Sequence, residues 1–228
     1  MRIVESLFFI VLTVALYQLM VKVYKRFPQP ILVPIATSTV LLIILLVMLR
    51  IPYETYMLGG SWIDELLGPA VVAFAYPLYQ NRRKLKEHAL SIIISVFVGT
   101  IIGLLSGLLL SFVFQVDDAL IRSLAPKSVT SPVATDIAEI IGGAPSLAAV
   151  YVMFAGIGGA IIGPFVLKHA RIHHPISMGV SLGAASHGIG TAKAYELGMI
   201  EGAISSISMT LSAVFASLLC PFIVQLLM

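Results

Sequence analysis

Two polar segments stand out in an otherwise apolar chain, because they combine cations with hydroxyl groups and glycines. The first, residues 125–145, contains five candidate residues for an anion-binding site. They are Lys127, Ser128, Thr130, Ser131 and Pro132. The second, residues 175–199, offers His187, Gly188, Gly190 and Thr191. A cation about 4 Å from a carboxylate contributes about 4 kcal/mol at an effective dielectric constant of 20. Hydroxyl groups supply further hydrogen bonds, so these residue types predict a site for a small carboxylate.

Each candidate cation also has a purely structural interpretation. Lys127 is expected either to bind the anion or to extend its ammonium group to the outer membrane interface. His187 is expected either to take part in binding or to stay neutral with a hydrogen bond to a backbone carbonyl. The sequence alone leaves both alternatives open.

Three carboxylates are candidates for proton coupling, because acidic side chains inside a membrane are costly and usually mark an ion path. They are Asp136, Glu196 and Glu201. Asp136 is the strongest of the three, since it lies within a predicted short helix. Glu196 and Glu201 have an alternative position at the membrane interface, and coupling to Na⁺ through unwound backbone is a further alternative.

The first segment is predicted to contain a short helix. Ser131 is a residue type that caps the free amide groups of a helix, and Pro132 suits the first helical position. Gly142, Gly143 and Pro145 then end the helix. About ten residues extend roughly 15 Å, which is half of a bilayer.

The second segment is interrupted by glycines, which permit an unwound turn or close packing between helices. Paired interrupted segments are the best sequence indication of a transporter's binding site. Non-helical backbone at that depth must be buried in protein or line water. We therefore expect the two segments to enter from opposite faces and to meet near the midplane of the membrane. Close helix packing is the alternative explanation for the glycines.

The elements that hold these segments must be membrane helices. Hydrophobic residues make up 59% of the 228 residues and charged residues only 11%, whereas soluble domains have about 25% charged residues. The stretches long enough to cross a bilayer are residues 6–21, 31–49, 62–79, 89–114, 146–167 and 203–228. We predict an all-α polytopic membrane helix bundle with about six full spans and two discontinuous or re-entrant segments, in an inverted-repeat transporter architecture.

The charged loops predict an orientation, since Lys and Arg collect on the cytoplasmic side of membrane proteins. Basic residues cluster at 22–26, 82–86 and 168–171, while the loop around Asp117 and Asp118 is mixed in charge. We therefore expect the basic loops in the cytoplasm. The net charge of +3 comes largely from these loops and does not predict nucleic-acid binding.

We expect a single membrane domain over residues 1–228, with N-terminal helices in 1–60 and the polar motifs in 61–228. Pro69 and Pro77 are expected to kink or break the stretch 62–79.

No enzyme activity is expected. Ser186 and His187 are neighbours in sequence, but adjacency does not supply a catalytic triad. No zinc, phosphate-binding or dinucleotide-binding motif is present, so we predict neither a metal nor a cofactor. The single cysteine, Cys220, excludes an intrachain disulfide and is expected to act as a small apolar side chain.

Several motifs resemble the LrgB/CidB family. They are Lys127-Ser-Val-Thr-Ser-Pro-Val-Ala, Ile141-Gly-Gly-Ala-Pro, Gly163-Pro, Ala185-Ser-His-Gly-Ile-Gly-Thr-Ala and Glu201-Gly-Ala-Ile-Ser-Ser. With Leu67-Gly-Pro-Ala-Val-Val-Ala-Phe-Ala-Tyr-Pro-Leu-Tyr, the resemblance covers the chain from about residue 60 onward. The family usually has Thr at the position of Ser131, and some members have a basic residue at the position of Glu139.

The resemblance implies a multi-pass protein of the bacterial cytoplasmic membrane that acts beside a smaller holin-like LrgA/CidA partner. Plastid relatives look like carriers of glycolate and glycerate, and bacterial relatives are linked to pyruvate and other small organic acids. This implies a transporter or facilitator of small monocarboxylates. The alternative is an antiholin-like regulatory protein that modulates murein hydrolase export, autolysis and cell lysis through the partner.

Gly99, Gly103 and Gly107 recur every four residues in the stretch 89–114. Small residues at this spacing let helices approach closely, so they predict a homodimer interface or, equally, packing within the chain.

Overall fold

The computed structural model describes residues 2–27, 29, 32–66, 69, 72, 75–80 and 82–228, and these contain helices but no strands. The chain divides into two compact units, Met1–Ala75 and Tyr76–Met228. The single membrane domain expected from the sequence stays a prediction.

The described helices of the first unit are α1 (Arg2–Arg26), α2 (Pro34–Met48) and α3 (Tyr53–Glu65). α1 packs against both of the others. The buried ring of Phe9 meets Tyr56 edge to face, with the ring centroids 5.8 Å apart. Gly59 lies against α1, where a side chain would collide with Ser6 and Phe9.

The helix α5 (Ala75–Gln80) follows, and Pro77 lies within it. Part of the stretch 62–79 falls outside the described residues, so the kinks expected at Pro69 and Pro77 stay predictions.

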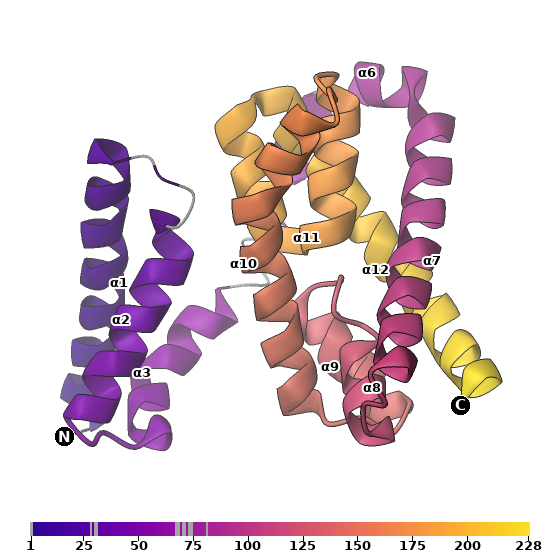
Figure 1. Cartoon of the computed structure of the whole chain (residues 1–228). Coiled ribbons are helices and arrows are strands. Elements are labelled where there is room, and N and C mark those ends of the chain that lie inside the picture. Colours follow the sequence, from indigo (N-terminus) through magenta and orange to yellow (C-terminus); the bar gives the residue numbers. More distant parts are fainter. Residues whose placement is uncertain are drawn as a thin grey trace. The chain divides into compact units, whose positions relative to one another are not determined.

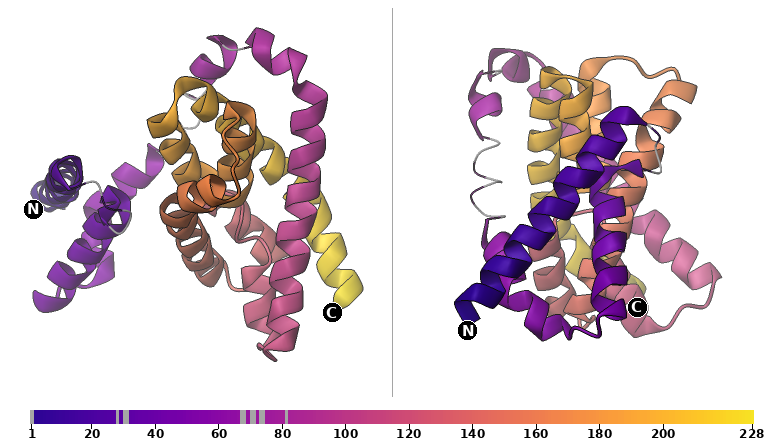
Figure 2. Two further views of the ribbon diagram at one scale, coloured as in Figure 1. Left: turned by 45° about the horizontal axis from the view of Figure 1, so that its top comes forward. Right: turned by 90° about the vertical axis from the view of Figure 1, so that its left-hand side faces the viewer.

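Long helices alternate with interrupted ones in the second unit (Figure 1). Its remaining helices are α6 (Arg82–Glu87), α7 (Ala89–Val113), α8 (Asp118–Leu124), α9 (Ser131–Ile140), α10 (Pro145–His169), α11 (Pro175–Leu197) and α12 (Met199–Leu227). α7 packs against α12 and α11, and α10 packs against α11 and α9. Figure 2 shows α7 beside α12 from a second direction.

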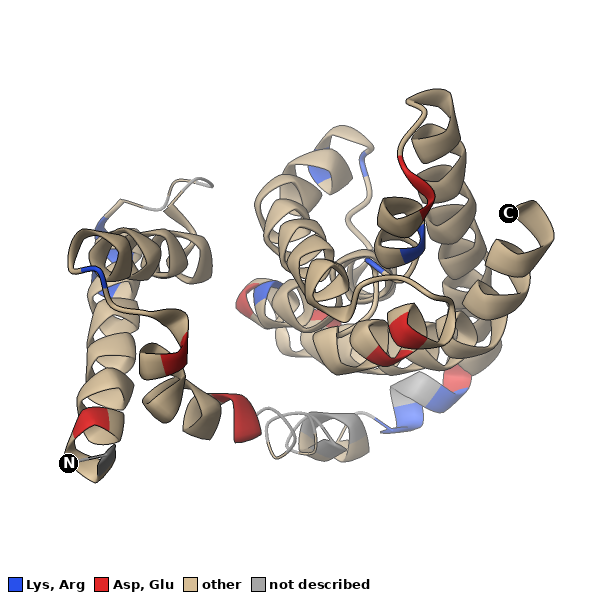
Figure 3. Ribbon diagram, turned by 90° about the horizontal axis from the view of Figure 1, so that it is seen from below, with Lys and Arg blue, Asp and Glu red and all other residues tan. Residues whose placement is uncertain are grey.

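Among the described residues, four helices are long and apolar enough to cross a membrane. They are Ile3–Arg26, Ala89–Val113, Pro145–His169 and Met199–Leu227, and they match four of the expected stretches. The stretch 31–49 forms α2, whose 15 residues are fewer than the roughly 20 that a span needs. The chain is therefore a helical membrane protein, while its six spans and its inverted-repeat architecture stay predictions. Figure 3 shows charged residues mainly near helix ends, with the long helices almost free of them.

The first interrupted segment turns back on itself, because Gly143, after α9, lies against Ser123 in the last turn of α8. We call α8, residues 125–130 and α9 the first hairpin, with residues 125–130 as its tip. α9 has 10 residues, as expected. Ser131 is already the first helical residue, and the cap position belongs to Thr130, which makes no side-chain capping hydrogen bond. The capping role predicted for Ser131 is therefore wrong by one position. Pro132 lies in the first turn of α9, as expected. Its missing amide hydrogen costs nothing there, because amide groups of the first turn have no partner within the helix.

Gly142 and Gly143 end α9 as predicted. Gly142 has φ +76°, a left-handed conformation that glycine adopts without steric cost. The Gly143 amide donates to Ala138 O at 2.7 Å, which is the long bond of a Schellman cap. The Arg122 guanidinium, on the other arm, donates to Ile141 O at 2.7 Å. These bonds hold the open end of the hairpin together.

The second interrupted segment, α11, breaks at Ser186 and His187, whose backbone angles are not helical. The chain folds back there. The evidence is that Leu182 and Ala194, on either side of the break, pack in one hydrophobic cluster. These two residues would lie roughly 18 Å apart in a straight helix. A side chain at Gly190 would meet the Leu182 backbone, so glycine lets the two arms touch. α11 is thus a second hairpin.

The hairpins enter their unit from opposite ends. The open end of the first lies between the end of α7 and the start of α10. The open end of the second lies between the end of α10 and the start of α12, so α10 separates them by its full 25 residues. Figure 1 shows α8 and α9 at one end of the unit and α11 at the other.

Candidate functional site

Lys127 lies in the tip of the first hairpin and is half-buried. Its ammonium group donates a hydrogen bond of 3.0 Å to the backbone oxygen of Gly103, on α7. One turn further along α7, Gly107 leaves the space that the end of this side chain occupies. Two of the glycines taken as an interface motif therefore contact Lys127, Gly107 by leaving space and Gly103 by its backbone oxygen, and the homodimer stays a prediction.

The charge of Lys127 has no acidic partner among the described residues. The ion pairs recorded there are Arg83 with Glu87 and Lys193 with Glu196. A backbone oxygen satisfies one ammonium hydrogen but carries no full negative charge. Lys127 thus has no recorded counter-charge among these residues, and anion binding by it stays a prediction.

The other predicted ligands of the first tip differ in position. Ser128 lines a cavity beside Gly103. Thr130 and Ser131 are half-buried at the start of α9, and Pro132 is exposed. None of these three lines the cavity.

His187 forms the tip of the second hairpin and is only 4% exposed. Its Nε2 donates a hydrogen bond of 2.9 Å to Val152 O, since a carbonyl oxygen can only accept. The hydrogen bond to a backbone carbonyl that the sequence analysis gave as the structural alternative is therefore present. Gly156, one turn along α10 from Val152, provides the slot for the imidazole, which lies 2.6 Å from where a Cβ would stand. Gly159 similarly makes room for Ser186.

The backbone of His187 is strained, with φ 41° and ψ −133°. Residues other than glycine rarely adopt such backbone angles, and the conformational strain costs of order 1–3 kcal/mol. Strained residues persist where the surroundings over-determine them, and they cluster at functional sites. From the sequence, the glycines of this segment permitted an unwound turn or close packing, and the turn falls on Ser186 and His187, which are not glycines.

The remaining predicted residues of this tip support the hairpin from within. The Thr191 hydroxyl donates to His187 O at 2.8 Å and lies 2.9 Å from the Ser205 hydroxyl of α12. Thr191 is fully buried. Gly190 permits contact between the arms, and Gly188 lies near Met209. These positions favour the packing explanation for the glycines, although the chain is interrupted as well.

The three candidate carboxylates lie apart from the tips. Asp136 is exposed on α9. Glu196 is exposed near the end of α11 and pairs with Lys193 at 2.6 Å. Glu201 lies in the first turn of α12 with its carboxylate over Gly198, where a negative charge favours helix formation. Proton coupling through any of them stays a prediction.

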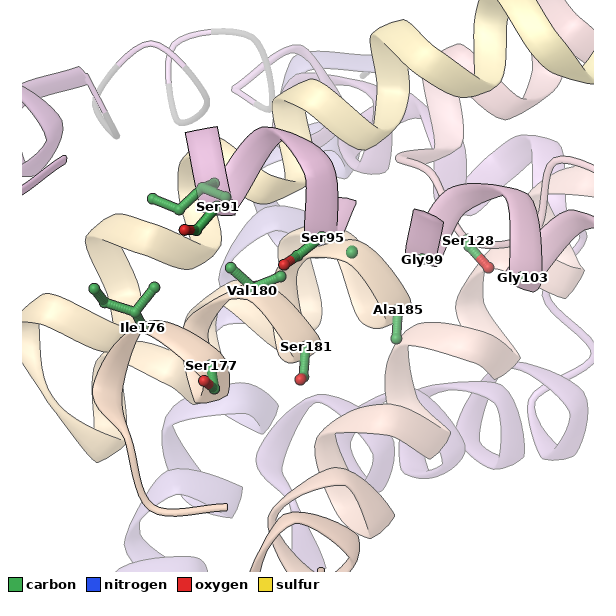
Figure 4. A pocket seen from close by; sticks show the side chains of 12 residues that line it. Ser91, Ser95, Gly99, Gly103, Ser128, Ile176, Ser177, Val180, Ser181 and Ala185 are labelled. Carbon is green, nitrogen blue, oxygen red and sulfur yellow. The ribbon is translucent and has the colours of Figure 1, made fainter. Parts of the chain in front are cut away.

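A cavity of about 500 Å³ extends from Ser128 in the first tip to the first arm of α11, and neither Lys127 nor His187 lines it. Ser128 and Gly103 line it from the side of the first tip, and Ala184 and Ala185 line it just before the second. The sequence analysis missed four of its lining residues: Ser91, Ser95, Ser177 and Ser181. In the sequence, the feature that could have revealed them is their spacing: two serines four residues apart on α7 and two more four residues apart on α11. Figure 4 shows these serines around the cavity, with Ser128 next to Gly103.

Comparison with known proteins identifies the family of the chain. The model of the LrgB-like family matches residues 13–226. YxaC of Bacillus subtilis, an uncharacterized protein, is 48% identical over 221 residues, which cover 97% of this chain and 96% of YxaC. The holin-like protein CidB of Staphylococcus aureus is 36% identical over 223 residues, which cover 98% of this chain and 97% of CidB. No solved structure matches the chain. Since both the family model and these relatives span nearly the whole sequence, the chain belongs to the LrgB-like family.

Proposed function

We propose that this chain is a transporter or facilitator of small monocarboxylates, such as pyruvate, glycolate or glycerate, in the bacterial cytoplasmic membrane. The single observation that carries the proposal is Lys127. Its ammonium group bonds to the backbone oxygen of Gly103, a residue that lines the cavity, although Lys127 itself is not a lining residue. The ion pairs of the described residues do not include Lys127.

The energetics favour Lys127 as the anion-binding group. An isolated ion that leaves water for an apolar medium is penalised by tens of kcal/mol, so a carboxylate needs replacement partners along its route. The start of α9 contributes about 0.3–1 kcal/mol to a nearby anion, which is too little alone. An ammonium group about 4 Å away contributes about 4 kcal/mol at an effective dielectric constant of 20. The Ser128 hydroxyl, on the cavity wall, adds a donor.

A second candidate function is regulation through a holin-like LrgA/CidA partner, with effects on murein hydrolase export and lysis. The observation behind it is that a relative at 36% identity is named holin-like protein CidB. The partner belongs to both proposals, because carboxylate flux through a complex would itself change membrane energetics.

Uptake of radiolabelled pyruvate and glycolate by proteoliposomes tests the transport function, with the chain alone and with its partner. We expect Lys127→Gln to lower the initial rate of uptake at least about tenfold. A tenfold change corresponds to about 1.4 kcal/mol, well below the attraction of about 4 kcal/mol between the ammonium group and the carboxylate. Lys127→Arg, which keeps the charge, should retain part of the rate. Lys168→Gln removes an exposed lysine at the end of α10 and is the matched control.

The outcome separates the two functions. Uptake that depends on Lys127 but not on Lys168 supports transport. Uptake at the background of empty liposomes, with and without the partner, contradicts it. If the Lys127→Gln chain then still binds the partner and restores lysis control in cells, regulation takes the place of transport.

A further inference from the structure

The cavity reaches the backbone that binds Lys127 and continues along the unit toward its basic end, although Lys127 is not one of its lining residues. Gly103 marks one end, where its backbone oxygen accepts the Lys127 hydrogen bond. Ser91 and Ser177 mark the other, near the starts of α7 and α11. Two basic groups of residues lie at that end: α6, directly before α7, and residues 168–171, directly before α11.

The walls of this cavity are two facing rows of small residues. On α7 the row repeats every four residues as Ser91, Ser95, Gly99 and Gly103. On α11 it includes Ser177, Ser181 and Ala185 at the same spacing. Figure 4 shows the two rows on opposite sides of the open space. At about 30 Å³ per water molecule, the cavity has room for roughly fifteen waters, enough for a small carboxylate with part of its hydration.

The hydroxyl groups in these rows differ from those of most buried serines in the unit, although Ser131, Ser146 and Ser186, outside the cavity, also have no recorded hydrogen bond among the described residues. Ser111 donates to Gly107 O at 2.9 Å and Ser208 to Ile204 O at 2.9 Å, one helical turn before each. Within the described part of the chain, no hydrogen bond is recorded for the cavity serines. They are Ser91, Ser95, Ser128, Ser177 and Ser181. Hydroxyls that the protein leaves unpaired can bond to water or to a solute in the cavity.

We propose that this cavity is an aqueous vestibule, open toward the basic end of the unit, through which the carboxylate reaches Lys127. The inference rests on the proposed function. It adds the route that the carboxylate takes and the side of the membrane to which the cavity is open. Cargo enters between α7 and the first arm of α11, exchanges hydration for the serine hydroxyls, and arrives at the ammonium group beside Gly103. By the distribution of basic residues, the open side is the cytoplasmic side.

Thiol labelling tests the vestibule without requiring transport. Ser95→Cys and Ser181→Cys place one thiol on each wall, and Val98→Cys is the matched control. Val98 is 46% exposed on α7 but does not line the cavity, so its thiol faces lipid. The native chain gives the baseline, since Cys220 is buried. Vesicles of known orientation are treated with an anionic, membrane-impermeant methanethiosulfonate, and the remaining thiols are counted with a maleimide-linked polymer on a gel.

We expect positions 95 and 181 to react at least about tenfold faster than position 98 from the cytoplasmic side, because a thiol needs water to ionise and react. From the opposite side the three positions should react alike. Pyruvate at saturating concentration should slow the reaction at 95 and 181 severalfold.

Reaction at the control rate from both sides, with Lys127-dependent uptake intact, overturns the vestibule and leaves the transport function standing. A lipid chain or a partner helix in the cavity gives this result. Reaction only from the opposite side also overturns it. Fast cytoplasmic reaction without protection by pyruvate, together with no Lys127-dependent uptake, overturns both the carboxylate route and the proposed function.

Discussion

The two hairpins of the second unit are alike in outline, but their tips are built differently. The first tip is an irregular loop, residues 125–130, which extends Lys127 to α7 and places Ser128 on a cavity wall. The second tip turns within Ser186 and His187, and both are almost fully buried. A group that binds a passing solute must keep some hydrogen-bonding capacity, whereas a group that fixes backbone can use all of it internally. Under the proposed function, this difference predicts that the first tip binds the cargo and that the second tip holds the backbone in place.

The surroundings of the second tip support this division. α10 presents Gly156 to the His187 ring and Gly159 to the Ser186 side chain, while Gly163 faces Leu182 on the first arm. The glycines fall on one face of α10, so the whole hairpin is seated in a groove of that helix. On the other side, a side chain at Gly183 would meet the backbone of Ser205 on α12.

The largest effect should come from filling this groove. Gly156→Ala and Gly159→Ala place a methyl group against His187 and Ser186, and overpacking of this kind costs about 1–3 kcal/mol. Gly158→Ala is the control in the same helix, since nothing lies within 4 Å of its added methyl group. That variant should be neutral or more stable, because Ala is favoured over Gly in a helix by about 0.5–1 kcal/mol. Thermal unfolding in detergent measures all three, and equal melting temperatures would show that the second tip is not locked.

The next effect concerns the strained backbone of His187. His187→Ala loses the bond to Val152 O and keeps the strain, whereas His187→Gly loses the bond but relieves the strain. We expect the Gly variant to be more stable than the Ala variant by about 1–2 kcal/mol. Denaturant titration in detergent gives the difference. An Ala variant at least as stable as the Gly variant would mean that φ 41° carries no cost here.

The kinetics of carboxylate uptake distinguish whether His187 binds the cargo or only positions the tip. If His187 only holds the tip, His187→Gly should lower the maximal uptake rate and leave the half-saturating carboxylate concentration within about twofold, since no ligand contact is removed. A half-saturating concentration raised tenfold or more would move His187 into the binding site.

Local signals in the sequence predicted the short helix α9 and its end, but not α8 and not the residue at the start of α9. Gly142 and Gly143 end α9 because their types suit a left-handed cap, and that preference is local. The long spans were predictable for a similar reason, since apolar length alone selects them. The interruption of α11 was also visible in its glycines.

The place of the second turn was not predictable, because tertiary contacts decide it. Gly188 and Gly190 are the intrinsically flexible residues, yet the positive φ falls on His187, which α10 holds by a carbonyl and a glycine slot. Likewise, Ser91 and Ser95 are two polar residues within a strongly apolar 25-residue helix, and only the packing of α11 opposite them reveals a cavity. Such features depend on residues far apart in sequence.

A smaller effect is expected at the open end of the first hairpin. Gly142→Ala puts a Cβ on a backbone at φ +76°, which should cost about 1 kcal/mol. Gly142→Asn is the control, because Asn tolerates this conformation better than Ala. The measured quantity is the melting temperature in detergent. If Asn and Ala lower it equally, a side-chain collision rather than backbone strain is responsible.

The smallest effect should distinguish two serines within the first tip. Ser128 lines the cavity without a recorded protein partner in the described residues, so Ser128→Ala should remove one hydrogen bond to the cargo or its water. One such bond is worth about 0.5–1.5 kcal/mol, which predicts a two- to tenfold loss of uptake rate. Ser131 neither lines the cavity nor caps α9, so Ser131→Ala should change the rate by less than about twofold. Initial uptake rates of the two variants, at equal amounts of reconstituted protein, make the comparison. If Ser131→Ala is the more damaging, the anion lies at the start of α9 instead of beside Gly103, and the first tip binds its cargo through the helix terminus.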